Sequence, residues 1–357
     1  MLLFPRNIGI ALSGGVDSTI AVALLLEQGF AVQGFFMLLL PDSEQQVGKV
    51  QNIADRLGIP LHLVDRREQF QQQIIASFTA TYRQGLTPNP CIICNRLIKF
   101  GLLLEAMAAK SMDAMATGHY ARVESGSLRR GLDSAKDQSY FLCRLTAKQL
   151  SRLILPLGTW RKQDVFARAR AMGFSNFEEG GESQDVCFLA GQDLAGFLDQ
   201  QGIEARSGEI ITEQGKVLGS HQGIWNYTVG QRRGLGLPDA TPWYVTGLDA
   251  ERNVVIVGKN QELFQRELLL ADMQWQIEPS EQWQGRVQLR SRHQAAEAKA
   301  VPTENGCWRV FFKEPQRAIT PGQFAVLYED DQVVGSGVIQ HHPLLAIYPD
   351  DILHHLS

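Results

Sequence analysis

The chain has 357 residues, of which 44% are hydrophobic and 20% are charged, and its formal net charge at pH 7 is −4. A chain of this length is too long for a single hydrophobic core and is predicted to form two or three domains. The composition excludes a low-complexity or disordered protein. No apolar stretch approaches the length of a bilayer span and no secretory signal is recognisable, so we expect a cytoplasmic protein without a membrane segment.

Residues 7 to about 120 alternate between short apolar runs and helical patterns. The predicted strands are 7–12, 31–39, 60–64 and 114–117, and the predicted helices are 18–28, 45–57, 69–83 and 95–110. This alternation is typical of an α/β fold with a parallel sheet and helices on both faces, a nucleotide-binding architecture.

The rest of the chain changes character twice. Residues 121–200 add a hairpin turned at Ser125-Gly126 and a helix at 162–172. A second hairpin, 207–212 with 216–218, opens a small central unit, and from 268 onward five short strands (286–290, 295–301, 308–313, 324–329, 333–340) predict a small β-barrel or sandwich. We therefore expect domains at 1–204, 205–267 and 268–357.

The turn between the first predicted strand and helix is rich in glycine and serine. A strand, a glycine turn and a helix aim backbone N–H groups and a positive helix end at one anion, and glycine lets the backbone approach that anion closely. The order differs from a Walker A loop, which ends in Gly-Lys-Ser/Thr. The alternative is an ordinary turn of small residues. We predict an ATP phosphate loop made of Ala11, Leu12, Ser13, Gly14, Gly15, Val16, Asp17 and Ser18.

A pair of cysteines, Cys91 and Cys94, stands at the predicted start of a helix, after two prolines. The positive end of a helix and the nearby charges of Arg96 and Lys99 are expected to favour the thiolate, the form that attacks and ligates. The C-x-x-C spacing also suits zinc, but a zinc site normally needs a second pair, and none is present.

The other three cysteines are isolated. Cys143 and Cys307 lie in apolar surroundings and are predicted core residues. Cys187 follows a polar, glycine-rich segment, and its surroundings alone leave a structural and a reactive role equally open.

Six motifs in order give the chain a family resemblance. It resembles the bacterial-type tRNA-specific 2-thiouridylases, members of the ATP pyrophosphatase (PP-loop) superfamily, over essentially its whole length. The motifs are the phosphate loop, Asn-Pro-x-x-x-Cys-Asn-x-x-Ile-Lys-Phe, Ala-Thr-Gly-His-Tyr, Lys-Asp-Gln-Ser-Tyr-Phe-Leu, Glu-Ser-Gln-Asp-Val-Cys-Phe and Thr-Val-Gly-Gln-Arg-Arg-Gly-Leu.

The resemblance implies an ATP-dependent tRNA-uridine 2-sulfurtransferase that thiolates the wobble uridine (position 34) of tRNAs for Lys, Glu and Gln. It implies that Cys94 is the catalytic thiol and that Cys187 carries a persulfide supplied by a cysteine desulfurase or a sulfur-relay protein. Met37 and Gly118 match positions that contact ATP, and Mg²⁺ is expected with it. Positions matching contacts to tRNA or its target base are Asn89, Pro90, Cys91, His119, Lys136, Asp137, Gln138, Arg290, Ser291 and Gln323.

Two departures and three alternatives accompany this resemblance. Ser291 replaces a tyrosine common in the family, and Cys91 replaces an aspartate. Because of the latter, Cys91, Cys94 and Cys187 could instead hold a [4Fe-4S] cluster with one open iron. An amide-forming ATP pyrophosphatase would not need the paired cysteines, and a non-catalytic nucleotide-binding module would release no pyrophosphate. We also expect Asp17 to help bind Mg²⁺, and basic surface clusters around Lys162 and Arg290 to meet phosphate.

Overall fold

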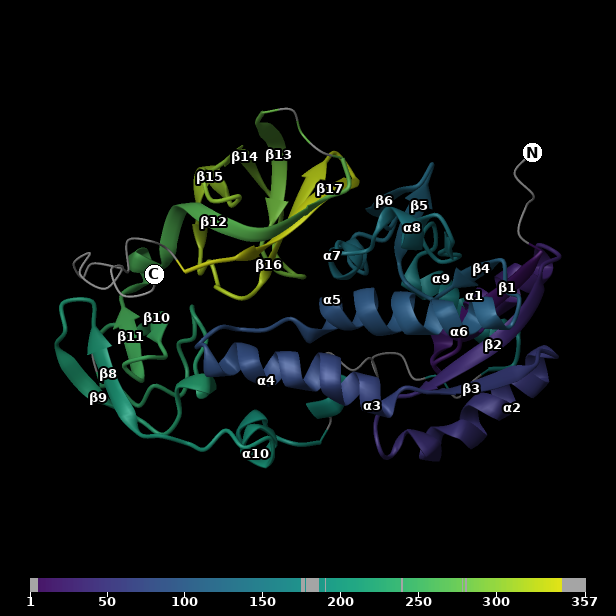
Figure 1. Ribbon diagram of the computed structural model, residues 1–357, viewed down its shortest axis with the longest axis horizontal. Coiled ribbons are helices and arrows are strands. Elements are labelled where there is room, and N and C mark those ends of the chain that lie inside the picture. Colours follow the sequence, from purple (N-terminus) through teal and green to yellow (C-terminus); the bar gives the residue numbers. More distant parts are fainter. Residues whose placement is uncertain are drawn as a thin grey trace, which may run out of the picture.

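The computed structural model describes residues 6–174, 177, 186–189, 191–238, 240–277, 279 and 281–341. Three units follow one another along this part of the chain: a parallel sheet with its helices, a small four-stranded sheet and a β-barrel (Figure 1). None of its helices is both long and apolar enough to cross a membrane.

The first unit is built on a five-stranded sheet in the order β3-β2-β1-β4-β7, and all neighbouring strands are parallel. Its strands are β1 (Asn7–Ala11), β2 (Ala31–Leu38), β3 (Leu61–Asp65), β4 (Ala114–Ala116) and β7 (Leu153–Ile154). The predicted parallel sheet is confirmed, and the two-residue strand β7 is an addition that no apolar run announced.

Strand β1 shows why helices cover both faces of this sheet. Ile8 and Ile10 are fully buried in a core shared with α1 (Val16–Glu27), α2 (Val47–Leu57) and α9 (Lys162–Ala171). Gly9 points the opposite way, where a Cβ atom would lie only 2.8 Å from Met107 Sδ of α6 (Leu103–Ala109). Alternate residues of one strand therefore contact two helical layers, and the glycine allows α6 to approach the strand closely.

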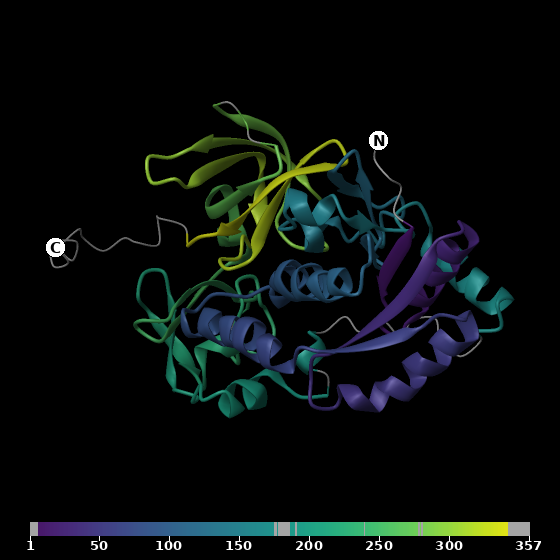
Figure 2. The same ribbon diagram turned by 45° about the vertical axis from the view of Figure 1, so that its right-hand side comes forward.

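Two long helices lie side by side between the sheet and the other units (Figures 1 and 2). The first joins α3 (Arg67–Phe70), a π-helical segment at Gln71–Ile75 and α4 (Ala76–Arg83). The second joins α5 (Pro90–Cys94), the π-helical segment η3 (Asn95–Leu102) and α6. It begins at Pro90, next to the start expected at the cysteine pair and before the apolar pattern of 95–110, because proline suits the first helical position.

The central unit is a sheet in the order β10-β11-β8-β9 with one helix, α10 (Leu194–Gln200). Its strands are β8 (Gly208–Thr212), β9 (Val217–His221), β10 (Tyr244–Asp249) and β11 (Val254–Gly258). Its core includes Phe78 and Cys94 of the long helices together with Phe197, Trp225 and Val255. The central unit thus packs directly on the helices that carry the cysteine pair.

Six strands of the third unit close into a barrel, because β12 pairs with both β15 and β17. They are β12 (Phe264–Trp275), β13 (Trp283–Gln288), β14 (Ala296–Pro302), β15 (Trp308–Arg317), β16 (Phe324–Glu329) and β17 (Gln332–Ile339). The predicted barrel is confirmed with five of these strands, whereas β12 was missed. Strand β12 spans the domain limit expected between residues 267 and 268. The two expected domain limits remain predictions.

A hairpin of the first unit, β5 (Ala121–Glu124) and β6 (Ser127–Arg130), continues the barrel sheet by pairing Arg129 with Gln332 of β17. The short helices α7 (Ser139–Leu142) and α8 (Ala147–Leu150) contact β6. The sheet of the barrel therefore extends into the first unit.

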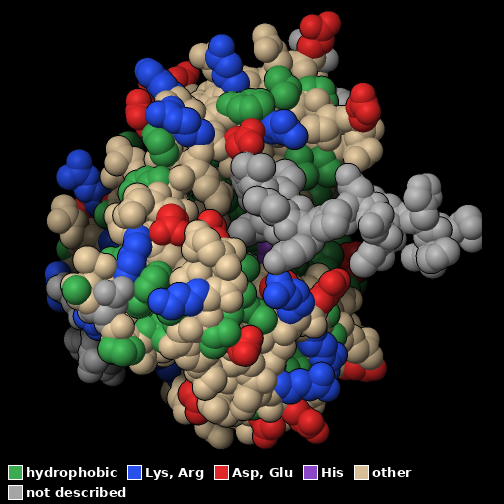
Figure 3. Space-filling view, turned by 90° about the vertical axis from the view of Figure 1, so that its left-hand side faces the viewer, with side chains coloured by type: hydrophobic (Ala, Val, Ile, Leu, Met, Phe, Trp, Pro, Cys, Tyr) green, Lys and Arg blue, Asp and Glu red, His purple; other side chains and the backbone are tan. Residues whose placement is uncertain are grey.

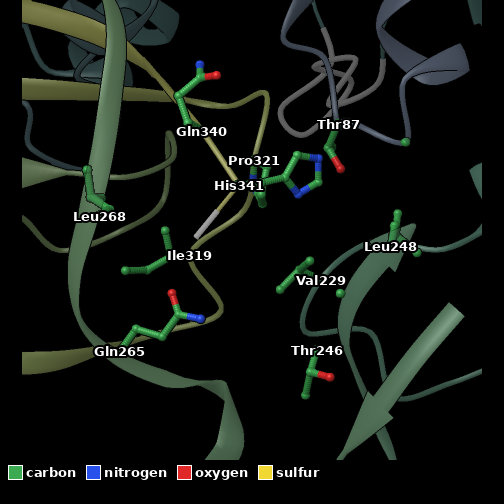
Figure 4. A pocket seen from close by; sticks show the side chains of 12 residues that line it. Thr87, Val229, Thr246, Leu248, Gln265, Leu268, Ile319, Pro321, Gln340 and His341 are labelled. Atoms are coloured by element: carbon green, nitrogen blue, oxygen red, sulfur yellow. The ribbon is translucent and has the colours of Figure 1, made fainter. Parts of the chain in front are cut away.

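The three units meet around a narrow cavity of about 20 Å³ (Figure 4). Thr87 comes from the first unit, Thr246 from the central one and Ile319 from the barrel. A space of this size holds about one water molecule and no nucleotide. The cavity marks the packing junction of the three units, and none of the predicted site residues lines it.

Candidate functional site

The predicted phosphate loop lies between β1 and the N-terminus of α1. Gly14 has φ +78°, the left-handed conformation that favours glycine, and Gly15 is the N-cap of α1 without a side-chain cap. The first N–H groups of a twelve-residue helix therefore remain available to an anion. The local geometry is that of an anion site.

Hydroxyl groups hold the loop in shape before any ligand binds. Ser18 Oγ accepts a hydrogen bond from Ser13 N (3.2 Å) and donates one to Gly15 O (3.1 Å), and it lies 3.2 Å from Ser13 Oγ. Thr19 Oγ1 also donates to Gly15 O (2.9 Å). The turn is thus fixed by its own side chains.

The predicted ATP-contacting positions converge at the carboxyl edge of the sheet. Leu12 follows β1, Met37 stands near the end of β2, and Gly118 follows β4. A Cβ atom on Gly118 would lie 2.8 Å from Asp17 C and Ser18 N, so the two loops touch backbone to backbone. This edge is where open α/β sheets bind ligands.

Asp17 is paired within the protein. Lys162 Nζ donates to both carboxylate oxygens (2.8 and 2.7 Å), and Tyr120 Oη donates to Oδ1 (2.6 Å). Lys162 is only 7% exposed, so the expectation that it belongs to a basic surface was wrong. The partners lie 145 residues apart, and no local pattern reveals them. The binding of Mg²⁺ by Asp17 stays a prediction.

Cys94 is a buried thiol. It is 7% exposed, within the core that the long helices share with the central unit. Burial raises the pKa of Cys94 to about 11, although the charge of Lys99 acts to lower it. The expectation that the helix start and nearby cations favour the thiolate was wrong for this conformation, since desolvation of the charged form outweighs them.

Cys91 and Cys187 are both exposed. The protein around them still removes part of their solvation and raises the pKa of each thiol, again opposed by Lys99. The charge of Cys187 also acts on Cys91 and Cys94, so the three thiols and Lys99 gather in one region. Lys99 follows Cys94 by five residues and lies in the π-helical segment that begins directly after Cys94.

Cys187 is anchored by the residue that follows it. The ring of Phe188 packs against Phe78 (5.0 Å), Phe197 (5.2 Å) and Phe70 (5.9 Å), centroid to centroid. These rings belong to the core that contains Cys94. Two glycines of the segment before Cys187, at positions 180 and 181, lie outside the described residues, and Gly191 has φ +79°.

The cysteines do not form a ready metal site. Across the described part of the chain, no three Cys, His, Asp or Glu side chains lie close enough together to hold a metal ion. The arrangement of Cys91, Cys94 and Cys187 therefore does not fit a [4Fe-4S] cluster. As predicted, Cys143 is a fully buried core residue, while Cys307 is half-buried.

The segment before the cysteines is bonded to the barrel. Gln323 Nε2 donates to Thr87 O and Pro88 O (both 3.0 Å), and its Oε1 accepts from Asn89 Nδ2 (3.3 Å). The adjacent Gly322 leaves no room for a Cβ, which would lie 2.8 Å from Thr87 O. Two residues expected to meet tRNA thus fix the path of the chain into Pro90.

His119 lies beside this centre. Its Nδ1 is 2.8 Å from Thr117 Oγ1, and its ring is 5.6 Å from that of Phe100. Burial, with a smaller contribution from Lys99, lowers the pKa of His119 to about 3. The imidazole is therefore neutral at physiological pH and suits hydrogen bonding rather than phosphate attraction.

The remaining predicted contacts to tRNA form two segments. In the first, the carboxylate of Asp137 accepts from Gly131 N, Ser139 N, Ser139 Oγ and Arg130, and Gln138 accepts from Tyr120 N. In the second, Arg290 and Ser291 are exposed on the barrel. The side chain of Asp137 is committed to the protein, whereas those of Arg290 and Ser291 face solvent.

On the face shown in Figure 3, Lys and Arg side chains are interspersed with Asp and Glu and do not form one large patch. Arg168 pairs with Glu27, and Lys313 with Glu297 (2.8 Å).

Two residues of the site were not predicted from the sequence. They are Lys162, as the partner of Asp17, and Tyr120, which also bonds to Asp17. The signal that could have indicated Tyr120 is its place in the Ala-Thr-Gly-His-Tyr motif.

Three family models match consecutive parts of the chain. They are described as a tRNA methyl transferase HUP domain (residues 6–191), a tRNA methyl transferase PRC-barrel domain (195–259) and an aminomethyltransferase beta-barrel domain (265–339). Their succession agrees with the three units of the fold.

Curated relatives match over nearly the full length. The tRNA-specific 2-thiouridylase MnmA of Desulfotalea psychrophila is 48% identical over 94% of this chain and 99% of its own, and that of Trichlorobacter lovleyi is 44% identical over 94% and 97%. A solved structure of the U34-tRNA thiolase NcsA from Methanococcus maripaludis with its [4Fe-4S] cluster is 18% identical, covers 56% of this chain and 68% of its own, and has a TM-score of 0.35, too low to bear on the sulfur chemistry here. By its full-length relatives, the chain belongs to the tRNA-specific 2-thiouridylase family.

Proposed function

We propose that this chain is an ATP-dependent tRNA sulfurtransferase that replaces the C2 oxygen of the wobble uridine, position 34, with sulfur in tRNAs for Lys, Glu and Gln. Membership of the 2-thiouridylase family supports this activity. The observation that carries the mechanism is the position of Cys187: the next residue, Phe188, packs on Phe78 and Phe197 of the core that contains Cys94. The site residues and the two domain limits given above are part of this proposal.

The first step uses the phosphate loop. ATP binds with its phosphates at the N-terminus of α1, where no side chain caps the first N–H groups of the helix. The C2 oxygen of uridine attacks the α-phosphorus, the bond to the β-phosphate oxygen breaks, and pyrophosphate leaves. Adenylation turns a poor leaving group at C2 into a good one.

The second step uses the two cysteines. A cysteine desulfurase or a relay protein loads sulfane sulfur onto Cys187. The terminal sulfur of this persulfide attacks C2 and AMP departs, leaving C2 bonded to Cys187 through two sulfurs. The Cys94 thiolate then attacks Cys187 Sγ, which releases 2-thiouridine and forms a Cys94–Cys187 disulfide. Alternatively, Cys94 attacks first and frees the sulfur as sulfide. Either way a dithiol must reduce the disulfide before the next turnover.

No step of this scheme is routed through an iron–sulfur cluster, because the cysteine arrangement of the described residues does not fit one. Mg²⁺ bound together with ATP would shield the charge of the phosphates. The protein's own groups supply the rest: N–H groups of the phosphate loop hold phosphate, and Lys99 stabilises anionic sulfur.

The test is mass-spectrometric quantitation of 2-thiouridine formed on unmodified tRNA-Lys with ATP and a persulfide-generating desulfurase, with iron excluded. We expect product from wild type and from Cys91→Ala, with one AMP and one pyrophosphate per thiolation, and none from Cys94→Ser. No product from wild type without iron, and product after anaerobic iron–sulfur reconstitution, would reject the persulfide route.

A further inference from the structure

Two segments proposed to contact tRNA are tied together by a pair of side chains. One segment, Lys136–Gln138, belongs to the first unit, and the other, Arg290 and Ser291, belongs to the barrel. Arg130 Nη1 donates to Asp137 Oδ2 (2.8 Å), and Arg130 Nη2 donates to Gln288 Oε1 (2.8 Å). Arg130 and Gln288 stand 158 residues apart in sequence, so this bridge crosses between the units.

The guanidinium of Arg130 is held in one orientation. It stacks on the ring of Tyr328 at 3.6 Å from the centroid, and its carboxylate partner, Asp137, is only 7% exposed. Ser139 Oγ joins the two sides of this arrangement, since it donates to Asp137 and lies 3.1 Å from Tyr328 Oη. A planar fork that reaches two acceptors while stacking on an aromatic ring is a geometry that arginine offers and lysine does not.

Gln288 connects Arg130 to the barrel segment that contains Arg290 and Ser291. Its side chain lies in the interior, as the residue is 4% exposed, and its Nε2 donates to Arg290 O (3.1 Å) and Ser291 O (3.0 Å). His293 N also donates to Arg290 O (2.9 Å), which closes the turn. The backbone of the segment is thereby fixed, while the side chains of Arg290 and Ser291 remain exposed.

We propose that Arg130 and Gln288 are positioning residues for tRNA: their bridge sets the spacing and orientation of the two contact segments, so that both meet one anticodon arm. This inference rests on the proposed function. It gives neither residue a contact with tRNA or with the reacting atoms.

The chain offers a matched control for a merely structural role. Arg129, the neighbour of Arg130, also joins the first unit to the barrel, through Asp331 and through Gln332 Oε1 (3.0 Å). Neither partner belongs to a segment proposed to contact tRNA. The variant Arg129→Met therefore weakens the contact between the first unit and the barrel but leaves the two contact segments unchanged.

The experiment measures binding of unmodified tRNA-Lys by fluorescence anisotropy at one fixed salt concentration, with thermal melts and ATP binding run in parallel. The variants of the full chain are Gln288→Met, Arg130→Lys, Arg290→Ala, the double variant Q288M/R290A and the control Arg129→Met. Q288M breaks only the barrel side of the bridge and keeps the Arg130–Asp137 pair, so it remains informative if Arg130 variants fail to fold.

We expect Q288M and R130K each to weaken tRNA binding roughly tenfold, the effect of losing hydrogen bonds to a charged group, with ATP binding unchanged and R129M equal to wild type. Because Gln288 acts through the segment that bears Arg290, Q288M/R290A should bind no more weakly than R290A alone. The inference is overturned if Q288M binds like wild type, if the two effects multiply in the double variant, or if R129M loses as much. Absence of tRNA binding by wild type would instead overturn the proposed function and this inference with it.

Discussion

The phosphate loop and the cysteine centre are prepared for their chemistry to different degrees. The loop is held by its own hydroxyls, by the close approach of Gly118 and by the Asp17–Lys162 pair. In the cysteine centre, Cys94 is a protonated, buried thiol, and Cys91 and Cys187 are exposed. Without any bound substrate, the phosphate loop already has the shape that adenylation needs. Sulfur transfer, in contrast, requires Cys94 to become accessible and ionised after the substrate binds.

The largest effect expected from this contrast separates the two steps. Cys187→Ser should lower 2-thiouridine formation by on the order of 10³-fold or more, because no other group carries the sulfur. Pyrophosphate release in the first turnover should stay within about twofold of wild type, since the phosphate loop is untouched. Rapid-quench assays of both products decide this, and an equal loss of both steps would show that the two regions are not independent.

The second expectation concerns the buried ion pair of the loop. Asp17→Ala leaves the ammonium of Lys162 buried without its counter-charge and should lower the free energy of unfolding by about 3 kcal/mol. The matched control is Glu27→Gln, which removes the partner of Arg168 in a solvent-exposed pair and should change it by less than about 1 kcal/mol. Urea unfolding measures both, and equal costs would contradict a structural role for the Asp17–Lys162 pair.

The third expectation tests how the cysteine centre controls ionisation. Lys99 lowers the pKa of all three thiols, so Lys99→Met should raise their pKa values. Since alkylation needs the thiolate, its rate-against-pH curve should move to higher pH, and alkylation at pH 8 should be slower by roughly three- to tenfold. Lys99→Arg and Lys110→Met, an exposed lysine at the end of the same helix, should match wild type. A curve unmoved in Lys99→Met would mean that the cation does not act on the thiols.

The smallest expected effect concerns the link between the barrel and the cysteines. Gln323→Ala removes the hydrogen bonds to Thr87, Pro88 and Asn89 and should reduce the rate of thiolation about fivefold, equivalent to one typical hydrogen bond. Adenylation should not change. Single-turnover kinetics on preadenylated tRNA provide the measurement, and a defect confined to ATP binding would contradict this role for Gln323.

Sequence reasoning succeeded where short-range patterns decide the structure. The parallel sheet, the glycine turn at Ser13–Gly15 and most barrel strands follow from period and turn chemistry. Strand β12 was missed because it pairs with two partners and changes register near Asp272, which has φ +46°, so that its apolar residues do not alternate regularly. The π-helical path of 95–102 was also missed, since no residue pattern distinguishes it from an α-helix.

The site was harder to predict than the fold for a physical reason. The ionisation of Cys94 depends on a core completed by Trp225 and Val255 of the central unit, and the charge of Asp17 depends on Lys162. Both effects depend on residues that are distant in sequence. The residues near Cys94 in sequence predicted a lowered pKa for its thiol, whereas burial raises it. Local charge predicted thiolate, and tertiary burial reversed it.

The extension of the barrel sheet into the first unit constrains the order in which the protein can form during its synthesis. Arg122 pairs with Asp331, 209 residues later, and Arg144, 2% exposed, donates to Asp272 and Ser336, 128 and 192 residues later. At about 5–20 residues per second, a ribosome needs roughly 10–40 s to supply these partners. During that interval Arg144 and the β5–β6 hairpin must stay hydrated, and the first unit cannot be completed. Ribosome-bound chains ending before residue 264 should therefore be protease-sensitive between residues 121 and 145, and chains extended beyond residue 339 should be protected there.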